Sequence, residues 1–158
     1  MDFRVGVGYD SHRFSEGRKL FLGGIEVPFP YGLLGHSDAD VVLHALCDAL
    51  LGAMGKGDIG EHFPDTDPVY KGIDSKKLLG HVFALVKKER FTVCNVDIVI
   101  VAQEPNLKNF KKLMAAVIAD ILGIDCDRVN IKAKTNEGMG FVGNKEGIAC
   151  YATAALRQ

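Results

Sequence analysis

The last long segment of the chain, Gly147 to Leu156, is apolar or semi-polar along its whole length. Successive side chains of a β-strand point to opposite faces of the sheet, so a strand with this pattern needs cover on both faces. The three helices expected elsewhere in the sequence can cover only one of these faces. We therefore expect the second face to pack against another subunit; the alternative is a strand that one chain buries on both sides.

The remaining hydrophobic patterns predict an α+β fold. Two short runs on either side of Gly23-Gly24 predict a hairpin near the N-terminus, 19–22 with 25–29, whose turn residues need positive φ. Alternating apolar and polar residues predict three further strands: 4–9, 92–103 and 129–135. Apolar residues at helical spacing predict three helices: 41–54, 75–89 and 106–122. This order of elements predicts a sandwich of one mixed, partly parallel sheet with helices on one face.

Size and charge restrict the class of protein. The chain has 158 residues, and we expect 1–158 to form a single domain. A net charge of -1 excludes the basic surface of a nucleic-acid binder. The apolar stretches are shorter than the ~20 residues that cross a bilayer, and residues 1–8 do not resemble a signal peptide. Four widely spaced cysteines favour buried free thiols over disulfides. We therefore expect a cytoplasmic protein without nucleic-acid or membrane partners.

The segment Asp10-Ser11-His12 follows the first predicted strand. Residues two apart in an extended segment point the same way, so the Asp10 carboxylate and the His12 imidazole converge. Such a pair supplies half of a zinc site and needs at least one further ligand. The alternative is a carboxylate that orients a histidine for structural reasons.

A second group of polar residues precedes and enters the first predicted helix. Asp40, His44 and Asp48 are spaced i, i+4, i+8 and share one helical face beside an apolar stripe. Ser37 is predicted to cap this helix, with Asp40 at the capping-box position. We further expect Asp40 to hold the His44 ring toward a metal, although solvent can also satisfy this polar row. His36 lies just before the helix start, where backbone N–H groups favour a phosphate.

Two further segments carry polar side chains in patterns that suit ligand binding. Segment 57–67 is rich in glycine and carboxylates, which can hold sugar hydroxyls; a solvated loop is the alternative. It lacks the ligand spacing of a calcium loop. Segment 132–141 ends a predicted strand with hydroxyl, amide and carboxylate groups together. There Thr135 can donate to a phosphate, and Glu137 can bind Mg²⁺, which takes one or two carboxylates besides substrate phosphates.

A series of short motifs runs in order along the whole chain: Gly-Tyr-Asp-Ser-His (8–12), Gly-Gly (23–24), Gly-Leu-Leu-Gly-His-Ser-Asp-Ala-Asp (32–40), His-Ala-Leu-Cys-Asp-Ala-Leu-Leu-Gly (44–52), Gly-Asp-Ile-Gly (57–60), Phe-Pro-Asp-Thr-Asp (63–67), Asn-Val-Asp (95–97) and Gly-Ile-Ala (147–149). Together they resemble the 2-C-methyl-D-erythritol 2,4-cyclodiphosphate synthase family of the non-mevalonate isoprenoid pathway. So many spaced motifs in one small chain are highly specific.

The resemblance implies a single catalytic domain with a ferredoxin-like fold. It also implies a homotrimer with three active sites at the subunit boundaries. Four residues correspond to the metal ligands of the family: Asp10, His12 and His44 for Zn²⁺, and Glu137 for a second divalent cation, Mg²⁺ or Mn²⁺. Three zinc ligands leave a fourth position for a phosphate oxygen, as in a catalytic site. His36 and Thr135 correspond to catalytic residues that stabilise the transition state.

The substrate contacts implied by the resemblance fall into three groups. The phosphates and the metal region involve the residues Asp10, Ser11, His12, His36 and Ser37. The erythritol and ribose parts involve Asp48, Asp58, Ile59, Gly60, Phe63, Pro64, Asp65, Thr66 and Asp67, of which Asp48 and Asp58 correspond to ribose-hydroxyl partners. The cytidine pocket involves Ala102, Gln103, Glu104, Pro105, Asn106, Leu107, Lys108, Lys134, Thr135, Asn136 and Glu137, and Phe141 is a further substrate contact.

The implied reaction is a phosphorus–oxygen lyase reaction on 4-diphosphocytidyl-2-C-methyl-D-erythritol 2-phosphate. Its 2-phosphate attacks its own β-phosphorus, which releases CMP and closes the eight-membered ring of 2-C-methyl-D-erythritol 2,4-cyclodiphosphate. Repulsion between the two phosphates is the main obstacle, and two cations can neutralise it. Two other classes are considered beside this enzyme. They are a catalytically silent zinc- and nucleotide-binding regulator and a metal-dependent phosphohydrolase.

The chain departs from the family pattern at two positions. Asn144, followed by Lys145, stands where the family commonly has an arginine that lines a central trimer cavity. Because that arginine holds an isoprenoid diphosphate in relatives, its replacement argues against this ligand here. The alternative is that Lys145 substitutes for the arginine, although a side chain at the adjacent position points elsewhere. Asn106 replaces a common lysine in the cytidine segment. Recognition of the base through backbone groups can tolerate that change.

Overall fold

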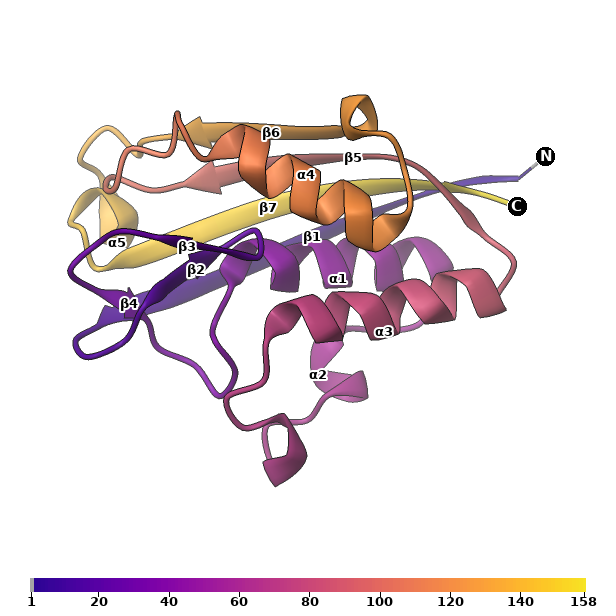
Figure 1. The fold of residues 1–158 in the computed structure, drawn as a ribbon, viewed down its shortest axis with the longest axis horizontal. Helices are drawn as coiled ribbons and strands as arrows, with labels where there is room; N and C mark the ends of the chain where they lie inside the picture. The colour runs from indigo at the N-terminus through magenta and orange to yellow at the C-terminus, as the bar shows by residue number, and fades with distance from the viewer. Residues whose placement is uncertain (1) are drawn as a thin grey trace.

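The computed structural model describes residues 2–158 and contains one large mixed sheet (Figure 1). Its strand order is β4–β1–β7–β5–β6, with the bounds β1 Phe3–Ser15, β4 Gly32–Leu33, β5 Thr92–Val101, β6 Val129–Lys134 and β7 Gly147–Arg157. β7 pairs antiparallel with both β1 and β5, whereas β5 and β6 are parallel. A separate hairpin consists of β2 (Leu20–Leu22) and β3 (Ile25–Val27). The predicted mixed α+β architecture is confirmed.

Three longer helices cover one face of the sheet (Figure 1). The helices are α1 Val41–Met54, α3 Ser75–Lys88 and α4 Lys111–Leu122, joined by the short α2 Ile59–His62 and α5 Gly140–Gly143 and the 3₁₀ turns η1 Pro68–Tyr70 and η2 Cys126–Arg128. α1 packs on β1 and β7, α3 packs on α1, and α4 links the parallel strands β5 and β6. Among residues 2–158, no helix combines the length and the apolar character needed to span a bilayer.

Two glycines of β1 determine how closely α1 approaches the sheet. A Cβ atom at Gly8 would lie 1.8 Å from the carbonyl oxygen of Ala45, and one at Gly6 would lie 2.0 Å from that of Ala49. Residues 6, 8, 10 and 12 of a strand share one face, so the same face continues into Asp10 and His12. The close contact therefore places the N-terminal turns of α1 directly opposite these two side chains.

The N-terminus of α1 differs from the predicted capping arrangement. Asp40 is the N-cap residue, and its carboxylate accepts from the backbone N–H groups of Val42 and Leu43. The same carboxylate, fully buried, also accepts from Gly23 and Gly24 in the hairpin turn. The predictions that Ser37 caps this helix and that Asp40 holds His44 were therefore wrong. Four backbone donors occupy the Asp40 carboxylate, and it links the hairpin to α1.

Element boundaries differ from the predictions where tertiary contacts decide them. β1 continues beyond the predicted 4–9 to Ser15, because the polar segment 10–13 pairs with the start of β7. The predicted helix 106–122 begins only at Lys111, since the side chain of Asn106 accepts from the backbone N–H of Lys108 in a turn. Segment 57–67, for which a solvated loop was the alternative, contains the one-turn helix α2.

On the face of the sheet opposite the helices, β1 and β7 expose large apolar side chains. Val5 and Val7 of β1 lie on it beside Tyr9, whose ring contacts that of Tyr151 on β7 with centroids 4.9 Å apart. Tyr151 is 49% exposed, so the alternative of a last strand buried on both sides by one chain is wrong. The other face of β7 is buried, as the apolar pattern requires. The exposed face is a surface that a second subunit can cover.

The cysteines are free thiols, as predicted. Cys47 and Cys150 are buried, and burial raises the pKa of both thiols. Cys126 is exposed, so the expectation of buried thiols was wrong for this position. Cys126 lies between Asp125 and Asp127 in a polar turn, where no apolar neighbours in the sequence draw it into the core.

Candidate metal centre and cleft

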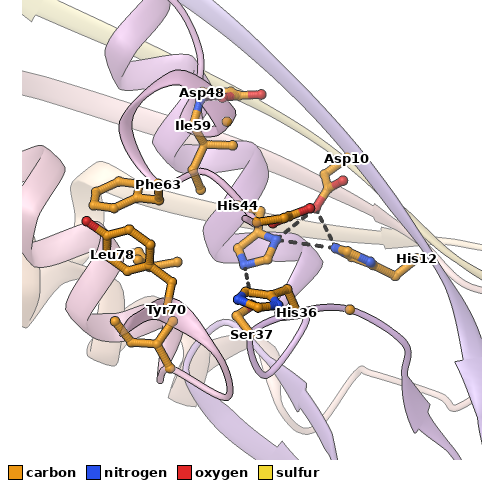
Figure 2. A pocket seen from close by; sticks show the side chains of 14 residues that line it. Asp10, His12, His36, Ser37, His44, Asp48, Ile59, Phe63, Tyr70 and Leu78 are labelled. Carbon is orange, nitrogen blue, oxygen red and sulfur yellow. Dashed lines mark hydrogen bonds and ion pairs between the residues drawn. The ribbon is translucent and has the colours of Figure 1, made fainter. Parts of the chain in front are cut away.

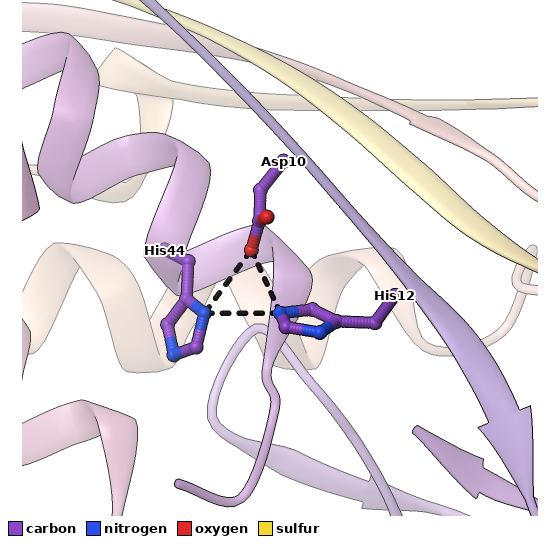
Figure 3. Close-up of side chains that lie close together, drawn as sticks. All are labelled: Asp10, His12 and His44. Carbon is purple, nitrogen blue, oxygen red and sulfur yellow. Dashed lines mark hydrogen bonds and ion pairs between the residues drawn. The ribbon is translucent and has the colours of Figure 1, made fainter. Parts of the chain in front are cut away.

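Three side chains from two elements converge on one point (Figure 3). Oδ2 of Asp10 lies 2.9 Å from Nε2 of His12 and 3.1 Å from Nδ1 of His44, and the two nitrogens are 3.3 Å apart. Asp10 and His12 extend from β1, and His44 extends from α1. These three residues are the only group of potential metal ligands found among residues 2–158. The convergence predicted for Asp10 and His12 is confirmed, and His44 completes it.

The spacing and the tautomers of this triad fit a bound cation. Two ligands at about 2.0–2.1 Å from a tetrahedral ion are themselves about 3.3 Å apart. Nδ1 of His12 lies 2.8 Å from the carbonyl oxygen of Leu34 and must donate to it, because a carbonyl only accepts. Nε2 of His12 therefore presents a lone pair to the triad. A cation or a proton has to lie between Nε2 of His12 and the carboxylate of Asp10, because both atoms are electron-rich.

The charges of the triad agree with this requirement. Burial opposes ionisation of the Asp10 carboxyl, but hydrogen bonds from His12 and His44 outweigh it and lower its pKa to about 2. Burial also opposes the charged form of His12, but the hydrogen bond to Asp10 and its charge raise the pKa of His12 above its ordinary value. Asp10 is thus an anion at neutral pH and attracts positive charge to this point.

The outward nitrogen of His44 is held by hydroxyl groups. Its Nε2 lies 2.9 Å from Oγ of Ser75 at the start of α3 and 3.1 Å from Oγ of Ser37. Ser75 in turn contacts the carboxylate of Asp38 through both its hydroxyl and its backbone N–H. Neither Ser75 nor Asp38 was predicted as a site residue. Ser75 is distant from His44 in the chain, and only tertiary packing brings it to His44 and to Asp38.

The triad lies at one end of a cleft with a volume of about 250 Å³ (Figure 2). Its lining includes predicted site residues from three segments: Asp10, His12, His36, Ser37, His44, Asp48, Ile59, Gly60, Phe63 and Asp65. Tyr70, Ile73 and Leu78 add an apolar wall that the sequence reading missed. In the sequence, apolar residues such as these indicate the hydrophobic core as readily as the wall of a cleft. The cleft therefore has a charged end at the triad and an apolar wall beyond it.

Several predicted carboxylates also hold the loop that borders the cleft. Oδ1 of Asp48 accepts from the backbone N–H of Ile59 at 2.7 Å, and burial raises the pKa of Asp48. Asp58 caps α2, and Asp67 caps η1. The ring of His36 approaches the carbonyl of Asp67 at 3.4 Å. Pro64 and Thr66 lie in the turn between α2 and η1.

The predicted cytidine segment forms a second pocket beyond the end of β5 and β6. It is lined by the predicted residues Ala102, Gln103, Glu104, Pro105, Asn106, Leu107, Lys108, Lys134 and Thr135, together with Lys111 and Ala133. Oε1 of Gln103 accepts from the backbone N–H groups of Asn136 and Gly138 and so fixes the turn between them. Ser11 and Phe141 line a third hollow with Arg13.

Glu137 belongs to this second region. It has φ of 51°, and its carboxylate accepts from the hydroxyl of Thr135 at 3.0 Å. In the sheet, β6 is separated from β1 by β7 and β5. At about 4.8 Å per strand step, β6, which ends just before the turn with Glu137, lies ~14 Å from β1 with Asp10. Most of the residues predicted for substrate binding that line a pocket therefore lie in two separate places of one chain, not in one.

Comparisons with known proteins agree with this geometry. A family model described as the YgbB family matches residues 3–157. A protein of Geotalea daltonii named 2-C-methyl-D-erythritol 2,4-cyclodiphosphate synthase is 56% identical over 155 residues, which cover 98% of this chain and 91% of that protein. The matched length and the identity are far above what a chance likeness produces.

Two solved structures are similar to the chain as well. The bifunctional IspDF from Campylobacter jejuni has a TM-score of 0.95 and 44% identity over 98% of this chain, which spans 42% of that protein. A 2C-methyl-D-erythritol-2,4-cyclodiphosphate synthase in its CDP-bound form has a TM-score of 0.90 and 37% identity, with 98% of this chain and 100% of that chain covered. The resemblance found in the sequence is confirmed, and the chain belongs to the YgbB family, that of the cyclodiphosphate synthases named here.

Proposed function

We propose that the protein converts 4-diphosphocytidyl-2-C-methyl-D-erythritol 2-phosphate to 2-C-methyl-D-erythritol 2,4-cyclodiphosphate and CMP, as a phosphorus–oxygen lyase. In this reaction an oxygen of the 2-phosphate forms a bond to the β-phosphorus, and the bond from that phosphorus to CMP breaks. The convergence of Asp10, His12 and His44 at one end of the cleft carries the proposal. Membership of the family and the CDP bound by a similar structure support it.

The proposed cofactors follow from the donor sets. Two imidazole nitrogens and one carboxylate oxygen suit Zn²⁺ with one position left for substrate, and Glu137 suits Mg²⁺ or Mn²⁺. When bound, the two cations would neutralise the phosphates and reduce their mutual repulsion. The residues of the chain have to hold the 2-phosphate and the diphosphate next to each other. That preorganisation supplies the entropy of ring closure.

The proposed substrate pose assigns one part of the molecule to each region. The erythritol unit lies along the 58–67 segment, and His36 and Ser37 bind phosphate oxygens at the triad end. The cytidine lies in the pocket of 102–108, where backbone groups read the base. Thr135, with its hydroxyl near Glu137, contacts the diphosphate as a catalytic residue. No general base is required, because a phosphate is already a nucleophile at neutral pH.

We propose a homotrimer of single catalytic domains, 1–158, with the family's ferredoxin-like fold and active sites between subunits. The separation of the two pockets in one chain supports this arrangement, since a neighbour can bring its Glu137 region to the triad. The apolar side chains that β1 and β7 expose on the sheet face, Val5 and Val7 among them, support burial against other subunits. We propose a cytoplasmic enzyme, and Asn144 argues against an isoprenoid diphosphate in the central cavity.

The test is incubation of the purified protein with the substrate, Zn²⁺ and Mg²⁺, followed by detection of all phosphorus-containing products. We expect CMP and the cyclic diphosphate in equal amounts over many turnovers. Bound substrate without CMP release would indicate the silent regulator, and a linear product or inorganic phosphate would indicate a phosphohydrolase. Either result overturns the proposal.

The metal assignment has its own matched variants. His44→Ala removes one of three ligands, so we expect loss of bound zinc and of activity while the subunits still assemble. His81→Ala, at an exposed histidine of α3 outside the triad, should keep its zinc. Full activity of His44→Ala without zinc would exclude the proposed centre.

A further inference from the structure

His44 is the one ligand of the triad whose second nitrogen faces side-chain hydroxyls. Nε2 of His44 lies 2.9 Å from Oγ of Ser75, whereas His12 uses a backbone carbonyl at the corresponding position. Ser75 is fully buried at the first turn of α3. A buried hydroxyl can donate once and also accept, so the direction of each of its hydrogen bonds has to be established.

The direction follows from Asp38. Oδ1 of Asp38 contacts the Ser75 hydroxyl, and Oδ2 accepts from the Ser75 backbone N–H at 3.0 Å. Oδ1 also accepts from the backbone N–H of Asp40 at 3.1 Å. A carboxylate only accepts, so the Ser75 hydroxyl donates its single proton to Asp38. Its oxygen can then only accept from His44, and Nε2 of His44 must carry the proton.

This chain of hydrogen bonds has a consequence for the metal centre. A neutral imidazole carries one proton, so a proton fixed on Nε2 leaves Nδ1 with its lone pair. Nδ1 is the nitrogen that faces Asp10 and His12. The hydroxyl of Ser37 at 3.1 Å can donate or accept and therefore does not fix the tautomer by itself.

We propose that Asp38 and Ser75 are positioning residues that hold His44 as its Nε2–H tautomer and so prepare Nδ1 to bind the metal. The proposal rests on the proposed function of the triad as a metal centre, and it replaces the role first expected of Asp40. It also gives α3 a task at the site, because the first turn of α3 carries Ser75. The segments 36–38 and 72–75 are joined by backbone hydrogen bonds, which keep Ser75 in place.

The first measurement uses the unaltered, metal-free protein. Its imidazole nitrogens are observed by ¹⁵N NMR at alkaline pH. We expect His44 to carry its proton on Nε2 and His12 on Nδ1. A proton found on Nδ1 of His44 would overturn the proposal without any variant, and the result does not depend on whether the protein is an enzyme.

The second measurement is zinc affinity, by competition with a chromogenic chelator. We expect Ser75→Ala and Asp38→Asn each to weaken zinc binding by about 10–100-fold, the usual loss when the partner of a ligating histidine is removed. In the same variants the His44 ring should become a mixture of tautomers, while the His12 ring is unchanged. A purely structural role of Ser75 would leave the tautomer of His44 as it is.

A matched control is Asp74→Asn. Asp74 caps the same helix, next to Ser75, but its carboxylate accepts from Lys76 and does not touch His44. The zinc affinity of the Asp74→Asn protein should lie within twofold of that of the unaltered protein. If Ser75→Ala does not fold, Asp38→Asn and the spectrum of the unaltered protein decide. Wild-type zinc affinity in a folded Ser75→Ala protein would refute the positioning role.

Discussion

Oδ1 of Asp48 accepts a hydrogen bond of 2.7 Å from the backbone N–H of Ile59. Asp48 lies one helical turn after His44 on α1, and Ile59 begins α2 in the segment that borders the cleft. One carboxylate therefore connects the helix that supplies a triad ligand with the loop proposed to bind the erythritol unit. This contact fixes the position of the loop relative to the helix, and so the position of one end of the cleft relative to the other.

Replacing this carboxylate should affect substrate binding more than metal binding. Asp48→Ala removes the acceptor for the Ile59 backbone N–H, so the loop is less well held for substrate binding. If the free energy of one hydrogen bond to a charged group is lost from binding, KM increases about tenfold. The zinc content should stay at one ion per chain, because Asp48 does not belong to the triad. Asp48→Asn keeps an oxygen at that position and should show a smaller increase. Loss of zinc in Asp48→Ala, or an unchanged KM, would contradict this assignment.

Zinc binding should weaken as the pH falls. The pKa of His12 is raised in the metal-free protein, so His12 is protonated and paired with Asp10 below that pKa. This pair stabilises the metal-free protein at low pH, and its contribution is lost as the pH rises through the pKa of His12. Protons and zinc compete for Nε2, so zinc affinity should fall about tenfold per pH unit below that pKa.

Asp10 adds little to this dependence, because its pKa of about 2 keeps it ionised throughout the working range. The measurement is the shift in melting temperature between zinc-loaded and chelator-treated protein at several pH values. We expect the shift to grow from about pH 5.5 to pH 8. A shift independent of pH would show that His12 does not exchange a proton for the metal.

The residues of the triad illustrate what the sequence can reveal. The spacing of Asp10 and His12 along a strand was enough to predict that they point the same way, and His44 lies on the polar row predicted for α1. The prediction that Asp40 holds His44 came from the same polar row and was wrong. A pattern of polar residues does not distinguish a carboxylate that caps a helix from one that faces a ligand. The observed Asp40 accepts from backbone groups on both the helix and the hairpin.

Other parts of the site depend on contacts that no local pattern contains. Ser75 meets His44 only because segment 72–75 packs against segment 36–38. Tyr70 and Ile73 look like ordinary core residues in the sequence, yet they line the cleft. Likewise, the pairing of residues 10–13 with β7 extends β1 through polar positions that alternation alone does not predict as strand.

Gly8 should be essential for stability. A Cβ at this position would lie 1.8 Å from a backbone oxygen of α1, and the helix cannot move without disturbing the His44 contact. We expect Gly8→Ala to lower the free energy of unfolding by about 3 kcal/mol or more, measured in urea at fixed protein concentration.

Gly52 is the matched control for Gly8. Gly52 lies on α1, the helix that packs against Gly8. A Cβ atom at Gly52 would have its nearest neighbour, the carbonyl oxygen of Val7, at 3.8 Å, which is an ordinary contact. Gly52→Ala should raise stability by about 0.5–1 kcal/mol, because alanine loses less backbone entropy in a helix. Similar losses in both variants would show that close packing of α1 on β1 is not the cause.

Gln103 should control the second cation and not the zinc. Its Oε1 accepts from both backbone N–H groups that flank Glu137, which has a left-handed backbone conformation. Without this acceptor the turn is less fixed, so Gln103→Ala should raise the Mg²⁺ concentration for half-maximal activity about tenfold. Gln103→Glu retains acceptor oxygens and should keep more of the response. An unchanged Mg²⁺ dependence in Gln103→Ala would separate Gln103 from the Glu137 carboxylate.

Mixed trimers test whether each active site takes residues from two chains. His44 lines the cleft, whereas Glu137 contacts Thr135 of the second pocket, so the proposed trimer combines His44 of one subunit with Glu137 of its neighbour. His44→Ala and Glu137→Ala homotrimers should each be inactive. Random assembly of the two chains in equal amounts restores a complete site at about a quarter of the boundaries, and we expect about that share of the wild-type rate. If tagged mixed trimers form and remain inactive, both residues must act within a single chain, and the boundary sites would have to be abandoned.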